Sequence, residues 1–319
     1  MKKLNGKIDL YSHFSIVIPA YNAAEFIVQT LNSIIETIPS TLEIVVVNDG
    51  STDRTFELLD KFGRRIQLIN QDNFGESIAV NNGIMATSRN YIMVLSADDL
   101  IINKSIFEES YKIFENEPNC LAVYPDWNII NSENQILEEI HTRNYSQKTM
   151  IMDSFCIPGP GTVFRKNQAI EIGLRNKKYK YVGDFDFWIK LSTKGYFRRL
   201  PLICASWRKH DNSTSINSKN LRMALERIAV IEDNLDRFNL SDKEINSAKA
   251  RASYQAALLS YFSYEVPGKD LFKNAIKYDK KIVLKTKITH TLFLLLFPIS
   301  FNLKNALIKC KLMKRLFPN

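Results

Sequence analysis

The sequence has little of what marks several large classes of protein. Its four cysteines lie far apart without a Cys-x-x-Cys pair, which argues against a disulfide framework or a cysteine-rich zinc site and favours a reducing compartment. No apolar run reaches the roughly 18–20 residues that cross a bilayer, and the nearest, 288–301, contains Pro298. Asp9 and His13 interrupt the stretch where a signal peptide would be apolar. With 319 residues, 45% of them apolar, the chain is instead typical of a globular protein of one or two domains.

Excess basic charge is also absent from most of the chain. Residues 267–319 hold 12 Lys/Arg and two acidic residues, a net of +10, whereas residues 1–266 hold 31 basic and 32 acidic residues, a net of −1. A nucleic-acid-binding protein needs basic residues spread over a binding face. We therefore expect no nucleic-acid partner.

What is present over the first 125 residues is an alternation of short β-branched runs with helical stretches, which predicts a mostly parallel α/β sheet. Near-continuous apolar strands fit a sheet that is covered on both faces. The expected strands are 15–18, 43–47, 66–69, 91–95 and 121–124, and the expected helices between them are 24–37, 54–62, 76–86 and 104–115. Further on, we expect a loop or hairpin over 128–140, a helix over 184–194, and a helical region from residue 216 with helices at 221–235, 242–264 and 271–282.

Polar and turn-forming residues follow the predicted strands, at 19–22, 48–51, 71–73 and 96–99. Ligands of such sheets bind beyond the carboxyl ends of the strands. This pattern is the main functional signal in the sequence. It lacks the Gly-x-Gly-x-x-Gly turn of a dinucleotide dehydrogenase.

Carboxylates in these segments have a structural and a functional interpretation. Asp49 belongs either to a well-capped strand–turn–helix or to a site that binds a nucleobase or ribose. Asp98 and Asp99 either cap the next helix or hold a divalent cation on substrate phosphates, since adjacent acids repel each other. Asp184 is either a helix N-cap or, among apolar neighbours, a partly desolvated general base.

A basic segment, Arg208-Lys209-His210, follows this region. Arg208 and Lys209 could bind phosphate, and His210 could ligate a metal. A lone histidine is more often structural, so both interpretations of His210 stay open at this point.

Taken together, these segments resemble family 2 glycosyltransferases of the GT-A fold, over about residues 14–210. Such a fold is a Rossmann-like, mostly parallel sheet flanked by helices; we expect it over residues 1–215, with an α-helical C-terminal region over 216–319. The resemblance is carried by FSIVIPAYN (14–22), VNDGSTD (47–53), NFG (73–75) with NNG (81–83), LSADD (95–99) and GDFDFW (183–188).

The resemblance implies a role for each matching residue. Those implied to bind the nucleotide-sugar donor are Pro19, Ala20, Tyr21, Asp49, Asp72, Asp98 and Arg208. Asp98, Asp99 and His210 would hold Mg²⁺ or Mn²⁺, and Asp184 would be the catalytic base. Two departures stand out: Ser96 replaces the first Asp of the usual Asp-x-Asp motif, and Gly183 replaces a Glu that often precedes the base.

The implied activity is transfer of a hexosyl or N-acetylhexosaminyl group, with inversion, from a nucleoside-diphosphate sugar. The nucleoside is expected to be uridine, and the acceptor a glycan or lipid-linked glycan in surface polysaccharide synthesis. Two alternatives stay open: transfer to polyprenyl phosphate, and a donor-binding or scaffold subunit with impaired catalysis, which Ser96 motivates.

The basic tail contains an apolar run, 291–297, flanked by Lys and Arg. This pattern predicts a peripheral contact with an anionic membrane, on the cytoplasmic side. The alternatives are a helix pair docked on the catalytic body or a homodimer contact.

Overall fold

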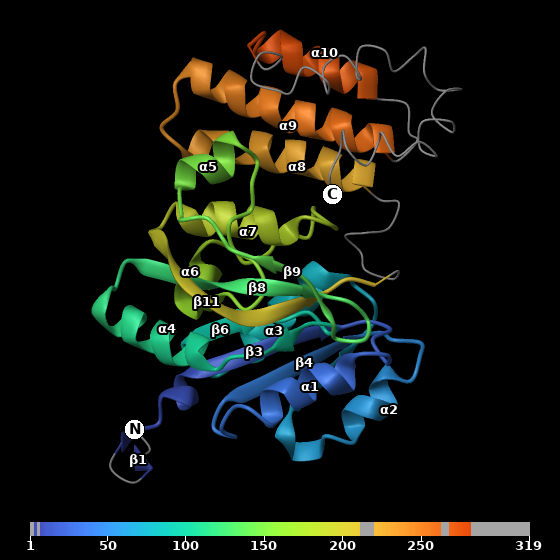
Figure 1. The fold of residues 1–319 in the computed structure, drawn as a ribbon, viewed down its shortest axis with the longest axis vertical. Helices are drawn as coiled ribbons and strands as arrows, with labels where there is room; N and C mark the ends of the chain where they lie inside the picture. The colour runs from blue at the N-terminus through green and yellow to red at the C-terminus, as the bar shows by residue number, and fades with distance from the viewer. Residues whose placement is uncertain (1–2, 5–6, 211–219, 263–267, 282–319) are drawn as a thin grey trace. The chain divides into compact units, whose positions relative to one another are not determined.

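The computed structural model describes residues 3–4, 7–210, 220–262 and 268–281 (Figure 1). The chain divides into two compact units, one made of Met1–Met150 with Cys156–Ser213 and the other of Ile151–Phe155 with Thr214–Asn319. Ile151–Phe155 belongs to the second unit although it lies far from the rest of that unit in the sequence. Of the predicted basic tail, 267–319, residues 268–281 are described, whereas the apolar run 291–297 and the basic residues after it lie outside the described residues.

The first unit is built on a nine-stranded sheet. Its order is β5 (Gln67–Gln71), β4 (Glu43–Asp49), β3 (Phe14–Ala20), β6 (Tyr91–Val94), β10 (Val163–Arg165), β8 (Cys120–Ile130), β11 (Tyr196–Arg208) and β7 (Leu100–Ile101), with β9 (Ile136–Ile140) paired to β8. The first four of these strands run parallel, as predicted. The second half is mixed, because β10 is antiparallel to both of its neighbours while β11 is parallel to β8. In a separate two-stranded sheet, β1 (Lys3–Leu4) pairs antiparallel with β2 (Lys7–Ile8).

Helices cover both faces of the parallel half (Figure 1). Val46 of β4 shares a core with α1 (Ile27–Ile35) and α4 (Ser105–Asn116), whereas Val45 and Val47 face α3 (Glu76–Ala86). Successive residues of a strand point to opposite faces, so two covered faces require an unbroken apolar strand. The remaining helices of this part of the chain are α2 (Thr55–Asp60), α5 (Gln147–Met152), α6 (Lys166–Glu171) and α7 (Gly183–Ser192).

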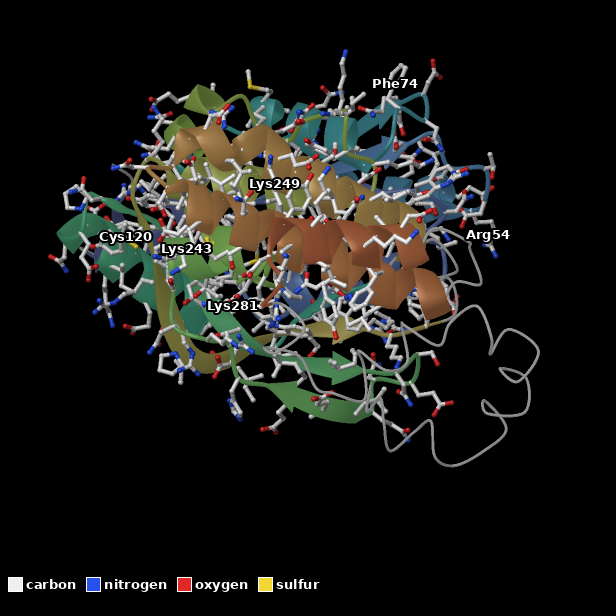
Figure 2. All side chains as sticks on the ribbon, turned by 90° about the horizontal axis from the view of Figure 1, so that it is seen from above. Arg54, Phe74, Cys120, Lys243, Lys249 and Lys281 are labelled. Atoms are coloured by element: carbon white, nitrogen blue, oxygen red, sulfur yellow. The ribbon has the colours of Figure 1, made fainter. Side chains whose placement is uncertain are left out.

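The C-terminal unit is helical in its described part, with α8 (Asn220–Asn234), α9 (Asp242–Phe262) and α10 (Gly268–Tyr278). Its core is rich in alanine, whose small side chain lets helices pack closely, and includes Ala224, Ala250, Ala257 and Ala275. Basic side chains such as Lys243 on α9 and Lys281 after α10 lie at its surface (Figure 2). Among the helices that the structure describes, none is both long and apolar enough to cross a bilayer.

Candidate functional site

The loops that follow β3 and β4 are bonded to each other at the carboxyl edge of the sheet. Asn22 adopts a φ of 50°, a conformation that asparagine tolerates better than most residues. Its Oδ1 accepts hydrogen bonds from the backbone N–H groups of Thr52 (2.8 Å) and Asp53 (3.3 Å). Asp53 in turn accepts from the N–H of Ala24 at 3.1 Å. The polar residues after the two strands therefore fix one loop against the other.

Asp49 fixes a third loop, the one that follows β5. Its carboxylate is 3% exposed and accepts from the Gln71 side chain (2.7 Å), from the N–H of Phe74 (2.9 Å) and from the N–H of Gly75 (2.9 Å). Gly50 allows the close approach, because a Cβ there would lie 2.6 Å from the backbone nitrogen of Asn73. Both oxygens of Asp49 are thus engaged in shaping the segment that leads into α3.

Two aromatic side chains stand out from these loops. Tyr21 is 50% exposed and Phe74 is 57% exposed. Phe74 is labelled in Figure 2. Ala20 is buried at the end of β3, whereas Asp72 is exposed on the loop that Asp49 holds. No role was predicted for Phe74 from the sequence. The large apolar ring next to a loop glycine was the signal available for it.

Asp98 meets His210 at the same edge of the sheet. Oδ2 of Asp98 lies 2.9 Å from Nε2 of His210, and the Asp98 side chain is 27% exposed. The imidazole also packs on Phe26, with ring centroids 4.8 Å apart. The structure thus brings together two of the three residues that were predicted to hold a metal.

The third, Asp99, turns into the protein. It is 3% exposed and accepts from the backbone N–H of Arg208 at 3.0 Å. Burial raises the pKa of Asp99 well above its ordinary value, and the charge of Asp98 adds to this, while hydrogen bonds from Arg208 and Ser96 oppose it. The Asp99 side chain therefore faces the protein interior, whereas the Asp98 side chain is partly exposed.

Arg208 is fully buried as well. Its Nε donates to the carbonyl oxygen of Asp98 at 2.8 Å, and its guanidinium lies over the ring of Phe26, 4.6 Å from the centroid. Burial lowers the pKa of Arg208, and the neighbouring charges of Asp98, Asp99 and Glu25 oppose this. The diphosphate contact expected for Arg208 from the sequence stays a prediction, and the hydrogen bonds described here join its guanidinium to protein oxygens.

The first turn of α7 presents Asp184 and Asp186 differently. Asp186 is buried in an ion pair with Lys190, 3.0 Å away. Asp184 is half-buried, and its Oδ1 accepts from the N–H of Phe185 at 2.8 Å. Asp184 is therefore accessible enough to act as a base, whereas Asp186 is buried and stabilises the helix through its ion pair with Lys190.

Gly183 lets α7 approach α3 closely. A Cβ at this position would overlap Oγ of Ser77, which lies in the first turn of α3. Because Asp49 fixes the entry to the same helix through Gly75, the chain that carries Asp184 is tied to the Asp49 loop. The absence of a side chain at 183, noted above as a departure, thus has a steric reason.

A pocket of about 450 Å³ lies beside α3, between Asn81 and Asn82 of the helix and the segment 173–177. None of the predicted catalytic or metal-binding residues lines it. Asn82 connects it to the site, since its amide donates to Gln71 (2.7 Å), the residue that donates to Asp49.

Asp98 and His210 suit a divalent cation. Among the described residues, no three His, Cys, Asp or Glu side chains converge in a way that could hold an ion. Mg²⁺ and Mn²⁺ are commonly held by one or two protein groups, with water and substrate phosphates completing the shell. The partly exposed Asp98 carboxylate and the His210 imidazole fit this requirement.

Comparison with known proteins decides the family. Residues 15–169 match the family model for Glycosyl transferase family 2. A Haemophilus influenzae protein described as an uncharacterized glycosyltransferase is 31% identical over 227 residues, which cover 63% of this chain and 67% of that protein. The chain belongs to glycosyltransferase family 2.

This glycosyltransferase is also 28% identical to the chondroitin synthase of Pasteurella multocida over 257 residues, 76% of the chain. It spans only 26% of that synthase. The glycosyltransferase therefore matches about a quarter of this much longer relative.

Solved structures share its fold. Staphylococcus aureus TarS, residues 1–349 in complex with UDP-GlcNAc, superposes with a TM-score of 0.63 at 16% identity, covering 83% of this chain and 80% of that one. A Pyrobaculum calidifontis mannosyltransferase in complex with GDP-Man and Mn²⁺ gives a TM-score of 0.56 at 15% identity, covering 88% and 78%. At these identities the likeness concerns the fold, and it confirms the predicted GT-A architecture.

Proposed function

We propose that this glycosyltransferase moves a hexosyl or N-acetylhexosaminyl group from a UDP-sugar to a hydroxyl of a glycan or lipid-linked glycan. The observation that carries the proposal is the 2.9 Å approach of Asp98 to His210, at the sheet edge where Asp49 organises the neighbouring loop. Similarity to a chondroitin synthase supports a role in surface polysaccharide synthesis. Similarity to a protein that was solved with UDP-GlcNAc supports the donor.

The strand-end loops would bind the nucleoside. Pro19, Ala20 and Tyr21 would line the base, with the exposed Tyr21 ring against its face. Asp72 would reach it from the loop after β5. Because both oxygens of Asp49 already accept protein hydrogen bonds, we assign Asp49 the task of holding that loop in place.

Asp98 and His210 would hold Mg²⁺ or Mn²⁺ against the diphosphate. When bound, such an ion neutralises the negative charge of the departing nucleoside diphosphate. Similarity to a mannosyltransferase that was solved with GDP-Man and Mn²⁺ supports a metal. The buried Asp99, one residue further, would act through its bond to the Arg208 backbone rather than as a direct ligand.

Asp184 would be the base. It would accept the proton of the acceptor hydroxyl while that oxygen forms a bond to the anomeric carbon. The bond from this carbon to the diphosphate oxygen breaks in the same step, so the configuration inverts. The transition state resembles an oxocarbenium ion, as in glycoside hydrolysis. The half-buried position of Asp184, beside a buried and ion-paired Asp186, supports this assignment.

The basic tail would hold the enzyme on the inner face of the cytoplasmic membrane, next to a lipid-linked acceptor. Residues 267–319 carry a net charge of +10, and each basic residue near an anionic surface contributes about 1 kcal/mol. A chain truncated after Val266 should lose binding to anionic vesicles. Unchanged binding would leave a helix pair docked on the catalytic body or a homodimer contact as the role of the tail.

The donor can be tested by thermal shift with a panel of nucleotide sugars, each with and without Mn²⁺. A ligand that binds only the folded state raises the melting temperature by mass action. A UDP-sugar should give the largest shift, and only with the metal.

Release of UDP distinguishes the acceptors. Release in the presence of a glycan acceptor would support transfer to a hydroxyl, whereas release only with polyprenyl phosphate would favour sugar transfer to that phosphate. Binding without any release would favour the donor-binding subunit.

A further inference from the structure

Arg208 meets three separate parts of the first unit from one buried position on β11. Its Nε donates to the Asp98 carbonyl, at 2.8 Å, in the segment between β6 and β7. Its Nη1 donates to Asn134 Oδ1 at 2.7 Å and to the Asn131 carbonyl at 3.1 Å, both in the turn between β8 and β9. Its Nη2 reaches Gln29 Oε1 on α1 at 3.4 Å. One side chain therefore joins the metal-binding segment to a distant hairpin turn.

The turn is shaped to receive this guanidinium. Asn134 has a φ of 65°, and its own Nδ2 donates to Gln29 at 3.4 Å. Asn131 Oδ1 accepts from the N–H groups of Glu133 (3.0 Å) and Gln135 (2.9 Å), which closes the turn and directs backbone carbonyls toward Arg208. Ser132 contributes a further carbonyl at 3.3 Å.

The charge of Arg208 has a clear use. The acceptors named above are uncharged oxygens, and the carboxylates of Asp98 and Asp99 lie near enough to interact with the charge of the guanidinium. Asp98 and Asp99 are adjacent carboxylates that repel each other. A buried guanidinium beside them offsets this repulsion while its hydrogen bonds hold the segment still.

We propose that Arg208 is a positioning residue, which clamps the Asp98–Asp99 segment to the β8–β9 turn so that Asp98 faces the metal site. The proposal rests on the proposed function in one respect, namely that Asp98 binds the metal. It differs from the diphosphate contact that the family resemblance implied, because the guanidinium is fully buried and directed to protein oxygens.

Asn134→Gly is the most informative variant. It removes the side-chain oxygen that Arg208 meets and leaves the residues of the metal site untouched, and glycine readily adopts the positive φ of the turn. Arg208→Lys replaces the planar guanidinium, with its several N–H donors, by a single ammonium group and keeps the positive charge. Arg198→Gln is the matched control, since Arg198 lies on the same strand with a 57% exposed side chain.

The first measurement is hydrogen exchange of the metal-free protein. Both Asn134→Gly and Arg208→Lys should speed exchange at least tenfold in the peptides that cover 96–103 and 128–136 together, and Arg198→Gln should change neither. The second is calorimetric binding of Mn²⁺ in the presence of UDP, which both variants should weaken by about tenfold, the effect typical of a residue that orients a metal ligand. Binding of UDP in EDTA should stay within twofold.

Two results would overturn the proposal. One is faster exchange confined to 128–136 in Asn134→Gly, with wild-type binding of Mn²⁺. The other is loss of UDP binding in EDTA in Arg208→Lys with uridine binding retained, which would make Arg208 a diphosphate ligand. If Arg208→Lys does not fold, Asn134→Gly decides alone. If the variants exchange faster in both 96–103 and 128–136 but the wild-type protein binds no Mn²⁺, the clamp is retained and the proposed metal site is rejected instead.

Discussion

Nε2 of His210 and Oδ2 of Asp98 lie 2.9 Å apart although 112 residues separate them in the sequence. If this pair binds the metal, substitution of either residue should weaken the affinity of the enzyme for Mn²⁺. Asp98→Asn and His210→Gln should each raise the Mn²⁺ concentration needed for half-maximal transfer by tenfold or more. Titration of activity with Mn²⁺ at saturating donor measures this.

The chain offers a matched control for this pair. His141 Nδ1 lies 3.1 Å from Asp126 Oδ2, but its side chain is 68% exposed and it lies outside the site. His141→Gln should leave the Mn²⁺ requirement within twofold of wild type. An equal effect of the two histidine substitutions would argue against a metal at Asp98.

Asp49 should support both the loop after β5 and the stability of the fold. Asp49→Asn places an amide N–H₂ where a carboxylate oxygen now accepts from Phe74 or Gly75. Hydrogen bonds to charged groups contribute about 1.5–3 kcal/mol, so we expect a loss of unfolding free energy of this order. Urea denaturation and amide exchange over 72–76 measure the two effects, with the exposed Asp60→Asn as control. Unchanged exchange in this loop would contradict the role assigned to Asp49.

Substitution of Gly183 by alanine should destabilise the fold less when Ser77 is substituted as well. Gly183→Ala would force its Cβ onto Ser77 Oγ, and such overpacking costs about 1–3 kcal/mol. Ser77→Gly removes the obstructing hydroxyl, so the double variant should recover part of the loss. A double-mutant cycle on unfolding free energy measures the coupling. Purely additive effects would mean that α7 and α3 do not meet there.

The buried Asp126 should make stability fall in acid. Burial would raise its pKa, but hydrogen bonds from Thr142, Arg199 and His141 outweigh this and lower the pKa to about 2. The unfolded value is about 3.9, so the carboxylate contributes about 2–3 kcal/mol above that pH. This contribution is lost as the pH falls toward the folded value. The difference in unfolding free energy between wild type and Asp126→Asn should therefore shrink from pH 5 to pH 3, and a constant difference would contradict the assignment.

Much of the parallel half of the fold could be predicted from the sequence. The predicted helix 76–86 matches α3, and the strand predicted at 43–47 lies within β4 (Glu43–Asp49). Here the apolar runs are continuous and the turns are marked by Asn, Asp and Gly, so local signals and tertiary structure agree. The second half was harder. β11 (Tyr196–Arg208) was not predicted, because its charged and irregular pattern, with exposed and buried residues out of simple alternation, hides a long strand.

The candidate site shows the same division. Local patterns identified the residues after each strand, and the structure places Asp98 against His210. Which way a carboxylate points is decided by distant partners, so neither the burial of Asp99 under Arg208 nor the use of Asp49 as a loop anchor could be predicted from neighbouring residues. Asn134 was missed for the same reason, since its partner lies 74 residues away.

The measurement that tests the account most directly is sugar transfer by Asp184→Asn, with Asp186→Asn as its matched control in the same helical turn. Loss of a general base slows reaction by about 10²–10⁴-fold. We therefore expect Asp184→Asn to lower kcat by this much with donor affinity within threefold of wild type, and Asp186→Asn to lower stability more than kcat, because Asp186 is paired with Lys190. Wild-type turnover in Asp184→Asn, with an acceptor hydroxyl as the nucleophile, would contradict the central claim.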